Sequence, residues 1–241
     1  MKTITFIAIT LIAGAISGTF LAVMNLGIVE PYIDEAINIE NQNAIAQGEV
    51  INPQEFSDYR LWQKSGEIAA GTILGISWGA LFGVVFVLSR NSIPGSNDKK
   101  KALILAGVML LVIYIVPALK YPANPPAVGD PETIYYRESL YFTLLTVSGL
   151  NALGLAFLYR KLGDKKGKQI VVPVIYIGII AAAFMILPPN PDEITAPMDL
   201  VIGFRIASGL TMSAFWGLLG FILGALWDKS RPHETARIAT V

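Results

Sequence analysis

The chain has no cysteine and one histidine among its 241 residues. The absence of cysteine excludes disulfide bonds and thiolate metal sites. The histidine, His233, lies in the C-terminal tail, which disfavours a histidine-based metal centre or a Ser-His-Asp triad within the apolar part of the chain. A G-x-x-x-x-G-K-[ST] phosphate loop is also absent. We therefore predict no enzyme, no permanently bound cofactor and no nucleic-acid partner.

Charge is scarce as well, at 15% of residues against roughly 25% in soluble domains. Hydrophobic residues make up 54% of the chain, in six runs near the length of about 20 residues that a membrane helix needs. We predict crossings over 3–29, 68–89, 102–119, 139–159, 170–187 and 200–227. The predicted fold class is an all-α polytopic membrane bundle of three hairpins, in one transmembrane domain over 1–241 in contact with lipid.

The net charge of zero conceals an asymmetry. Thirteen of the 18 Lys and Arg residues lie at the N-terminus, in every second gap between the runs, or in the tail. By the positive-inside rule both termini are cytoplasmic, including the tail 228–241, and segment 30–66 is external. This predicts a multi-pass protein of the cell membrane. A signal peptide is an alternative for the first run, but the run continues for about 27 residues without a convincing cleavage site.

The loops that follow the third and fifth runs resemble each other. In both, Asn-Pro is followed six residues later by another proline and then by an arginine. The matched residues are Asn124-Pro125, Pro131 and Arg137 in the first loop, and Asn190-Pro191, Pro197 and Arg205 in the second. Either prolines have simply accumulated in loops, or the second and third hairpins are an internal repeat. Repeats of this kind build transporters whose site lies at the repeat interface.

The long external segment has two parts. Residues 30–37 have apolar positions at near-helical spacing with Pro31 in the first turn, which predicts a short interfacial helix. The Asn- and Gln-rich residues 41–54 favour a flexible surface loop.

Glycine recurs every fourth residue in the second run, at Gly71, Gly75, Gly79 and Gly83. Residues four apart share one helix face, so another backbone can lie closely against this one. The first run offers Gly14 and Gly18, and the last run offers Ser213, Gly217, Gly220 and Gly224. These faces predict packing within the monomer, an oligomer contact, or a sliding surface in a transport cycle.

Few polar residues fall within or beside the runs. Arg205 either extends its side chain back to the external surface or faces the interior, paired with Glu67 or Asp199. Glu30 and Glu67 stand at the two ends of the external segment, as interface residues or as ligands. Asn25 must find a hydrogen-bond partner inside an apolar run. The external acids attract cations, or they collect there only because orientation depends on Lys and Arg.

Three stretches resemble the CbtA family of cobalt transporter subunits. They are the opening helix with Gly14, Gly18 and Asn25, the glycine-rich second helix, and the proline-rich stretch 116–131 leading to Arg137. The resemblance implies an integral membrane protein that imports cobalt for cobalamin synthesis, beside a small single-span partner that supplies histidines. Many members are described with five crossings, whereas this chain has six predicted ones.

Our leading hypothesis is a subunit that moves a divalent cation, Co²⁺, inward. Glu30, Glu67 and Asp199 would attract or coordinate the metal. Asn25 would lie on the substrate path, Asn124 and Asn190 would shape the paired loops, and Arg137 and Arg205 would position the acids. The alternative is an accessory or scaffold subunit of a larger membrane complex, or a homo-oligomer, in which the glycine faces are docking surfaces.

Overall fold

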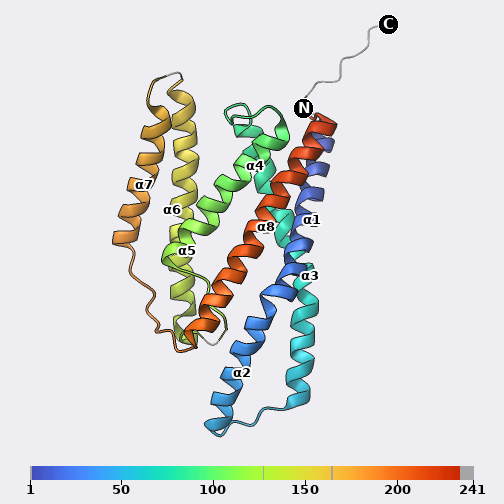
Figure 1. Ribbon diagram of the computed structural model, residues 1–241, viewed down its shortest axis with the longest axis vertical. Helices are drawn as coiled ribbons and strands as arrows, with labels where there is room; N and C mark the ends of the chain where they lie inside the picture. The colour runs from blue at the N-terminus through green and yellow to red at the C-terminus, as the bar shows by residue number, and fades with distance from the viewer. Residues whose placement is uncertain (1, 127, 164, 234–241) are drawn as a thin grey trace. The chain divides into compact units, whose positions relative to one another are not determined.

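The computed structural model describes residues 2–126, 128–163 and 165–233. These residues form helices joined by loops, and no strand occurs among them (Figure 1). The α-helices are α1 (Thr3–Ile28), α2 (Glu30–Ala46), α3 (Pro53–Ser89), α4 (Asp98–Met109), α5 (Val116–Lys120), α6 (Ile134–Lys161), α7 (Lys168–Ile186) and α8 (Met198–Ser230). A π-helical segment, η1 (Leu110–Ile115), joins α4 to α5, and a 3₁₀ turn, η2 (Pro131–Thr133), precedes α6.

Six helical segments in the described part of the chain are long and apolar enough to cross a membrane. They are Thr3–Ile28, Pro53–Ser89, Asp98–Lys120, Pro131–Lys161, Lys168–Ile186 and Met198–Ser230. The prediction of an all-α bundle with six crossings is confirmed, including the third and fifth crossings with their internal prolines. The internal repeat stays a prediction.

The external segment is more helical than predicted. The short helix expected over 30–37 continues to Ala46, and α3 already begins at Pro53. Asn52 starts α3, because its Oδ1 accepts hydrogen bonds from the backbone N–H of Gln54 and Glu55. The flexible loop expected over 41–54 is therefore wrong for all but 47–52. At 37 residues, α3 is about 55 Å long, well beyond the ~30 Å hydrocarbon layer.

The chain divides into two compact units. Unit 1 contains 1–28, 51–108 and 210–241, and unit 2 contains 29–50 and 109–209. Each unit therefore combines segments that are distant in sequence, and α8 contributes to both. The prediction of a single transmembrane domain stays a prediction.

Glycines join α1 to α3 in unit 1. Gly14 and Gly18 of α1 face Gly71, Gly75 and Gly79 of α3. A Cβ atom added to Gly79 would lie 2.7 Å from the Gly14 Cα and 2.8 Å from the Thr10 carbonyl oxygen. Only hydrogen fits in that space, so the two backbones touch. For α1 and α3, packing within the monomer is the correct interpretation of the glycine faces.

The rest of the unit 1 core is aromatic. The Trp216 ring of α8 lies 5.6 Å from Trp78 and 6.3 Å from Phe82, measured between centroids. Nearer the end of α8, the Trp227 ring lies 5.0 Å from Phe86. Phe82, Phe86 and both of these α8 tryptophans are almost completely buried. Large rings thus fill the space between α3 and the second part of α8.

The first turn of α4 is capped from another helix. Asp228 of α8 accepts hydrogen bonds from the backbone N–H groups of Asp98 (2.9 Å) and Lys99 (3.1 Å). These N–H groups have no partner within their own helix, so a carboxylate there stabilises the helix end. The Asp98 side chain pairs in turn with Arg90 at 2.8 Å. The ends of α3, α4 and α8 are therefore linked by charged groups.

Unit 2 is built around two smaller apolar clusters. Val29, Phe204 and Ala207 pack the start of α2 against the first part of α8. Tyr121, Leu140 and Leu144 join the end of α5 to α6, with residues of α7 alongside. Figure 1 shows α6 and α7 as antiparallel neighbours.

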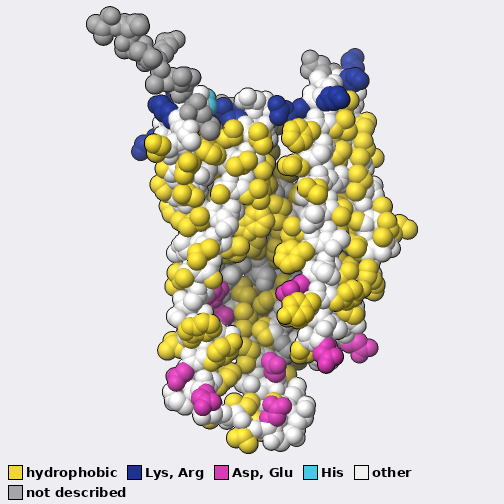
Figure 2. Space-filling model, turned by 180° about the vertical axis from the view of Figure 1, so that it is seen from behind, with side chains coloured by type: hydrophobic (Ala, Val, Ile, Leu, Met, Phe, Trp, Pro, Cys, Tyr) yellow, Lys and Arg dark blue, Asp and Glu magenta, His cyan; other side chains and the backbone are white. Residues whose placement is uncertain are grey.

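Basic and acidic side chains separate along the helices within each unit. On the face shown in Figure 2, Lys and Arg gather at one end and Asp and Glu at the other. Apolar side chains occupy the length between them. This distribution matches the alternation of charge in the sequence.

Candidate functional site

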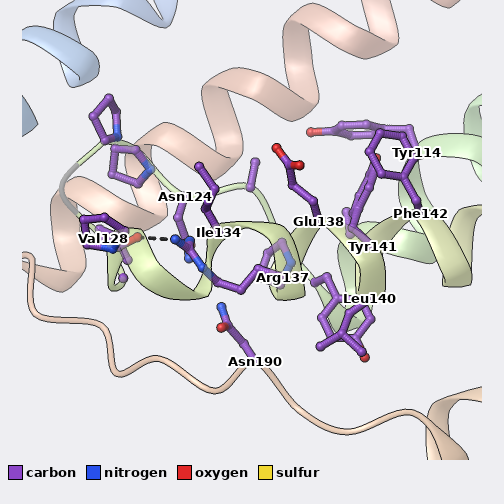
Figure 3. A pocket seen from close by; sticks show the side chains of 18 of the residues that line it. Tyr114, Asn124, Val128, Ile134, Arg137, Glu138, Leu140, Tyr141, Phe142 and Asn190 are labelled. Atoms are coloured by element: carbon purple, nitrogen blue, oxygen red, sulfur yellow. Dashed lines mark hydrogen bonds between the residues drawn. The ribbon is translucent and has the colours of Figure 1, made fainter.

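A cavity of about 730 Å³ lies within unit 2. Its wall comes from η1 and α5, from the proline-rich loop 121–131, and from the first turns of α6. Glu40 of α2 and Asn190 of the α7–α8 loop complete it (Figure 3). Three of the predicted site residues, Asn124, Arg137 and Asn190, are thereby brought together around one cavity.

Arg137 connects the two proline-rich loops. Its Nε lies 2.9 Å from Asp192 Oδ2, in the loop between α7 and α8. Its Nη1 and Nη2 donate to the carbonyl oxygens of Val128 (3.4 Å) and Asp130 (3.1 Å) in its own loop. Both ion-pair partners are largely buried, with 24% and 9% of their side chains exposed. The arginine therefore fixes one loop against the other.

Asp192 receives further donors from the first loop. Its Oδ2 accepts hydrogen bonds from the Thr133 hydroxyl at 2.6 Å and from the Asp130 backbone N–H at 3.1 Å. Gly129 adjoins the ion pair of Arg137 and Asp192 and has a φ of +97°. A Cβ atom added to it would lie 2.9 Å from Arg137 Nη1. Only glycine adopts this backbone and leaves this space without strain.

Arg205 makes the converse connection, from α8 to the first loop. Its Nη2 donates to Asn124 Oδ1 at 2.7 Å and its Nε donates to the Ala123 carbonyl oxygen at 3.2 Å. Both acceptors are neutral oxygens of the loop, so neither of these bonds is the pairing with Glu67 or Asp199 that was one of the two alternatives for Arg205. Each matched arginine therefore binds the loop of the other hairpin.

Two more bonds close the loops over the helix ends. The Tyr121 hydroxyl donates to the Pro188 carbonyl oxygen at 2.5 Å, and Lys120 Nζ donates to the Phe184 carbonyl oxygen at 2.8 Å. Burial, and secondarily the neighbouring Tyr136, raises the pKa of Tyr121 above its ordinary value. The phenol thus keeps its proton and its donor role over the whole neutral range. Asn190 supports the same loop by accepting from the Asp192 backbone N–H at 3.2 Å.

The third crossing reaches the cavity through its π-helical segment. Pro117 has no N–H, and the Val116 N–H donates to the Leu111 carbonyl in the wider π pattern. The Val112 carbonyl is thus left without a donor from its own helix. The buried Ser148 hydroxyl of α6 donates to it at 2.5 Å, and the Tyr176 hydroxyl of α7 lies 2.7 Å from Ser148. One polar chain therefore links three crossings.

The other predicted site residues lie apart from this cavity. Asp199 is exposed in the first turn of α8 and lines a second cavity of unit 2, of about 370 Å³, with Tyr32 and Glu35. Glu30 begins α2 and is buried. Asn25 and Glu67 belong to unit 1 and are half-buried. The described residues contain no group of three or more His, Cys, Asp or Glu side chains that could hold a metal ion, so the metal role of Glu30, Glu67 and Asp199 stays a prediction.

Sequence reasoning missed four residues of this region: Asp192, Glu138, Tyr114 and Tyr141. Asp192 follows the matched Asn190-Pro191 dipeptide by one position, and Glu138 directly follows Arg137. These adjacent positions are the signal that could have marked the two acids. The tyrosines lie in apolar crossings, where an aromatic residue gives no sign that it lines a cavity.

A family model described as "Probable cobalt transporter subunit (CbtA)" matches residues 3–228. The chain belongs to the CbtA family. Neither a curated protein nor a solved structure matches it. Membership of the CbtA family and the six candidate crossings make the chain a multi-pass membrane protein. The description as a subunit implies that CbtA proteins act with a partner in a transporter complex.

Proposed function

We propose that this CbtA-family chain is the membrane subunit through which a divalent cation, Co²⁺, enters the cell for cobalamin synthesis. The observation that carries the proposal is the family match over nearly the whole chain. The structure adds a cavity of about 730 Å³ in unit 2, lined in part by the proline-rich loop after α5. The family description is of a transporter subunit, and we expect no catalysis.

We propose further that both termini are cytoplasmic. The basic residues then lie on the inner side, as the positive-inside rule requires. The loops 121–131 and 187–197 face outward in this orientation, so the cavity receives the ion from outside. Acidic residues gather at the same helix ends (Figure 2), and their field raises the local concentration of cations. Glu30, Glu67 and Asp199 would contribute to that capture.

Uptake of radioactive cobalt tests the function. Liposomes that contain the purified protein should accumulate ⁵⁷Co²⁺ above empty liposomes, either alone or with the partner subunit. The resemblance to CbtA proteins suggests a small single-span partner that supplies histidines. Uptake no higher than in empty liposomes, with and without such a partner, would reject the transport role. A stoichiometric large partner with no dependence on the ion would favour the scaffold role.

Labelling tests the orientation. The chain has no cysteine, so a single cysteine introduced by Lys166→Cys is the only thiol. An impermeant thiol reagent should leave it unlabelled in intact cells and label it after the membrane is opened. A cysteine introduced by Glu132→Cys, in the opposite loop, should show the converse pattern.

A further inference from the structure

The walls of the unit 2 cavity indicate how a cation would be bound there, provided that the proposed transport function holds. A bare first-row divalent ion needs several oxygen or nitrogen ligands that converge at about 2.0–2.2 Å. Among the described residues, no group of three or more His, Cys, Asp or Glu side chains could supply such a set. The cavity therefore has no cluster of these side chains to hold a bare ion.

The cavity is instead large enough for an ion with its water. Its volume is about 730 Å³, whereas six waters occupy roughly 180 Å³ at about 30 Å³ each. Small divalent cations release their waters reluctantly and are commonly bound through one or two carboxylates with most of that shell retained. A hydrated ion thus fits, with space for further waters between it and the walls.

The wall residues are suited to accept hydrogen bonds from such a shell. Glu138, on the first turns of α6, is exposed and lines the cavity. Tyr114 and Tyr141 line the same cavity as this carboxylate (Figure 3). Phenol oxygens accept hydrogen bonds, and aromatic faces attract cations. A second carboxylate, that of Glu40, also lines the cavity.

The positive charge of Arg137 repels a cation in the cavity only weakly. Arg137 is neutralised by Asp192 at 2.9 Å. Its guanidinium is directed to the Val128 carbonyl oxygen, as the dashed line in Figure 3 shows, and away from Glu138. The charge left for the cavity is therefore that of the carboxylates.

We propose that this cavity binds the divalent cation as its aqua complex, through hydrogen bonds from the coordinated waters to Glu138, Tyr114 and Tyr141. No bond between the metal and the protein forms at this stage. Such a site recognises charge and the size of the hydrated ion, so it selects weakly among Co²⁺, Ni²⁺ and Mg²⁺. Selection for cobalt then belongs to a later step or to the partner subunit.

Hexaamminecobalt(III) tests the proposal directly. This complex keeps its six ammonia ligands in water, so it can donate hydrogen bonds but cannot accept a protein ligand. Binding of ⁵⁷Co²⁺ to the full-length protein in phosphatidylcholine nanodiscs is measured against unlabelled Co²⁺, Mg²⁺ and hexaamminecobalt(III). We expect all three to displace the label. Glu138→Gln should weaken the binding of Co²⁺ and of the ammine complex alike, by about tenfold for the loss of one charge-assisted contact.

Glu132→Gln is the matched control, because Glu132 is an exposed acid of the same loop region that does not line the cavity. It should leave both affinities unchanged. If Co²⁺ displaces the label but the ammine complex does not, even at about a hundredfold excess, the metal is coordinated directly and this inference is overturned while the transport function stands. If ⁵⁷Co²⁺ neither binds nor enters liposomes, the proposed function fails as well. Equal effects of the two Glu→Gln variants would also overturn the assignment to this cavity.

Discussion

The two units of this protein are stabilised by different means. In unit 1, backbones touch through Gly14, Gly18 and Gly75, and large aromatic rings fill what remains. In unit 2, proline-rich loops are joined by arginines and leave a cavity of about 730 Å³ beside them. Lipid gives no hydrophobic drive for helix association, so close packing and hydrogen bonds must supply it. Unit 1 relies mainly on close packing, whereas unit 2 relies mainly on hydrogen bonds and contains the cavity.

The largest effect is expected at the glycine contact of unit 1. Gly79→Leu places a side chain where the α1 backbone already lies, so the helices must separate. We expect a loss of about 3 kcal/mol or more in the free energy of unfolding, at the upper end for overpacked sites. Gly107→Leu is the control, because no atom lies within 4 Å of a Cβ there. Unfolding in mixed detergent micelles measures both, and equal stability of the two variants would contradict the comparison.

The arginine connection of unit 2 should give the next largest effect. Asp192→Ala leaves Arg137 without its carboxylate and removes the acceptor used by Thr133. We expect a loss of about 2 kcal/mol, below the 3–5 kcal/mol for fully buried pairs because Arg137 is partly exposed. The control is Glu193→Ala, at the exposed residue next to Asp192, which should leave the free energy of unfolding unchanged. The double variant Asp192→Ala/Arg137→Ala should cost less than the sum of the two single variants, and full additivity would refute the pairing.

A hydroxyl inside the bilayer should have a smaller effect. Ser148→Ala leaves the Val112 carbonyl without a donor. We expect a loss of about 1–1.5 kcal/mol, near the upper range for hydrogen bonds between membrane helices. Tyr176→Phe should cost less, since the Val112 bond remains. The control variant is Thr146→Ala, at an exposed residue of the same helix. If it lowers the free energy of unfolding as much as Ser148→Ala does, the Ser148 hydrogen bond does not stabilise unit 2.

The smallest expected effect concerns the charged helix ends of unit 1. Asp228→Ala removes the acceptor for two N–H groups at the start of α4. The cost should be about 1 kcal/mol, the usual value of a helix cap. Lys229→Ala, at the exposed next residue, should be neutral. If Asp228→Ala were neutral as well, water would bind the two N–H groups equally well, and the Asp228 cap would not stabilise α4.

Part of this arrangement could be predicted from the sequence. Hydropathy was sufficient for six crossings, because lipid requires long apolar runs. The four-residue glycine period indicated a close helix contact, and the matched loops drew attention to Asn124, Asn190, Arg137 and Arg205. These signals are local and periodic, so a single sequence displays them.

The features that could not be predicted depend on contacts between segments that are far apart in the sequence. Asp192 is the partner of Arg137 only because two loops about 60 residues apart approach each other. The helical continuation of α2 through an Asn-rich stretch was hidden because those residues favour loops in isolation. Hydropathy also cannot detect the π-helical turn before Pro117, which leaves no change in the apolar pattern.

That turn has a consequence for biosynthesis. The segment Asp98–Lys120 has the highest mean hydropathy of the six, so on composition alone it should leave the translocon readily. Its Val112 carbonyl, however, accepts a hydrogen bond from Ser148 of the following crossing. An unbonded carbonyl in hydrocarbon is costly. We therefore expect these two crossings to leave the translocon for the lipid as a pair.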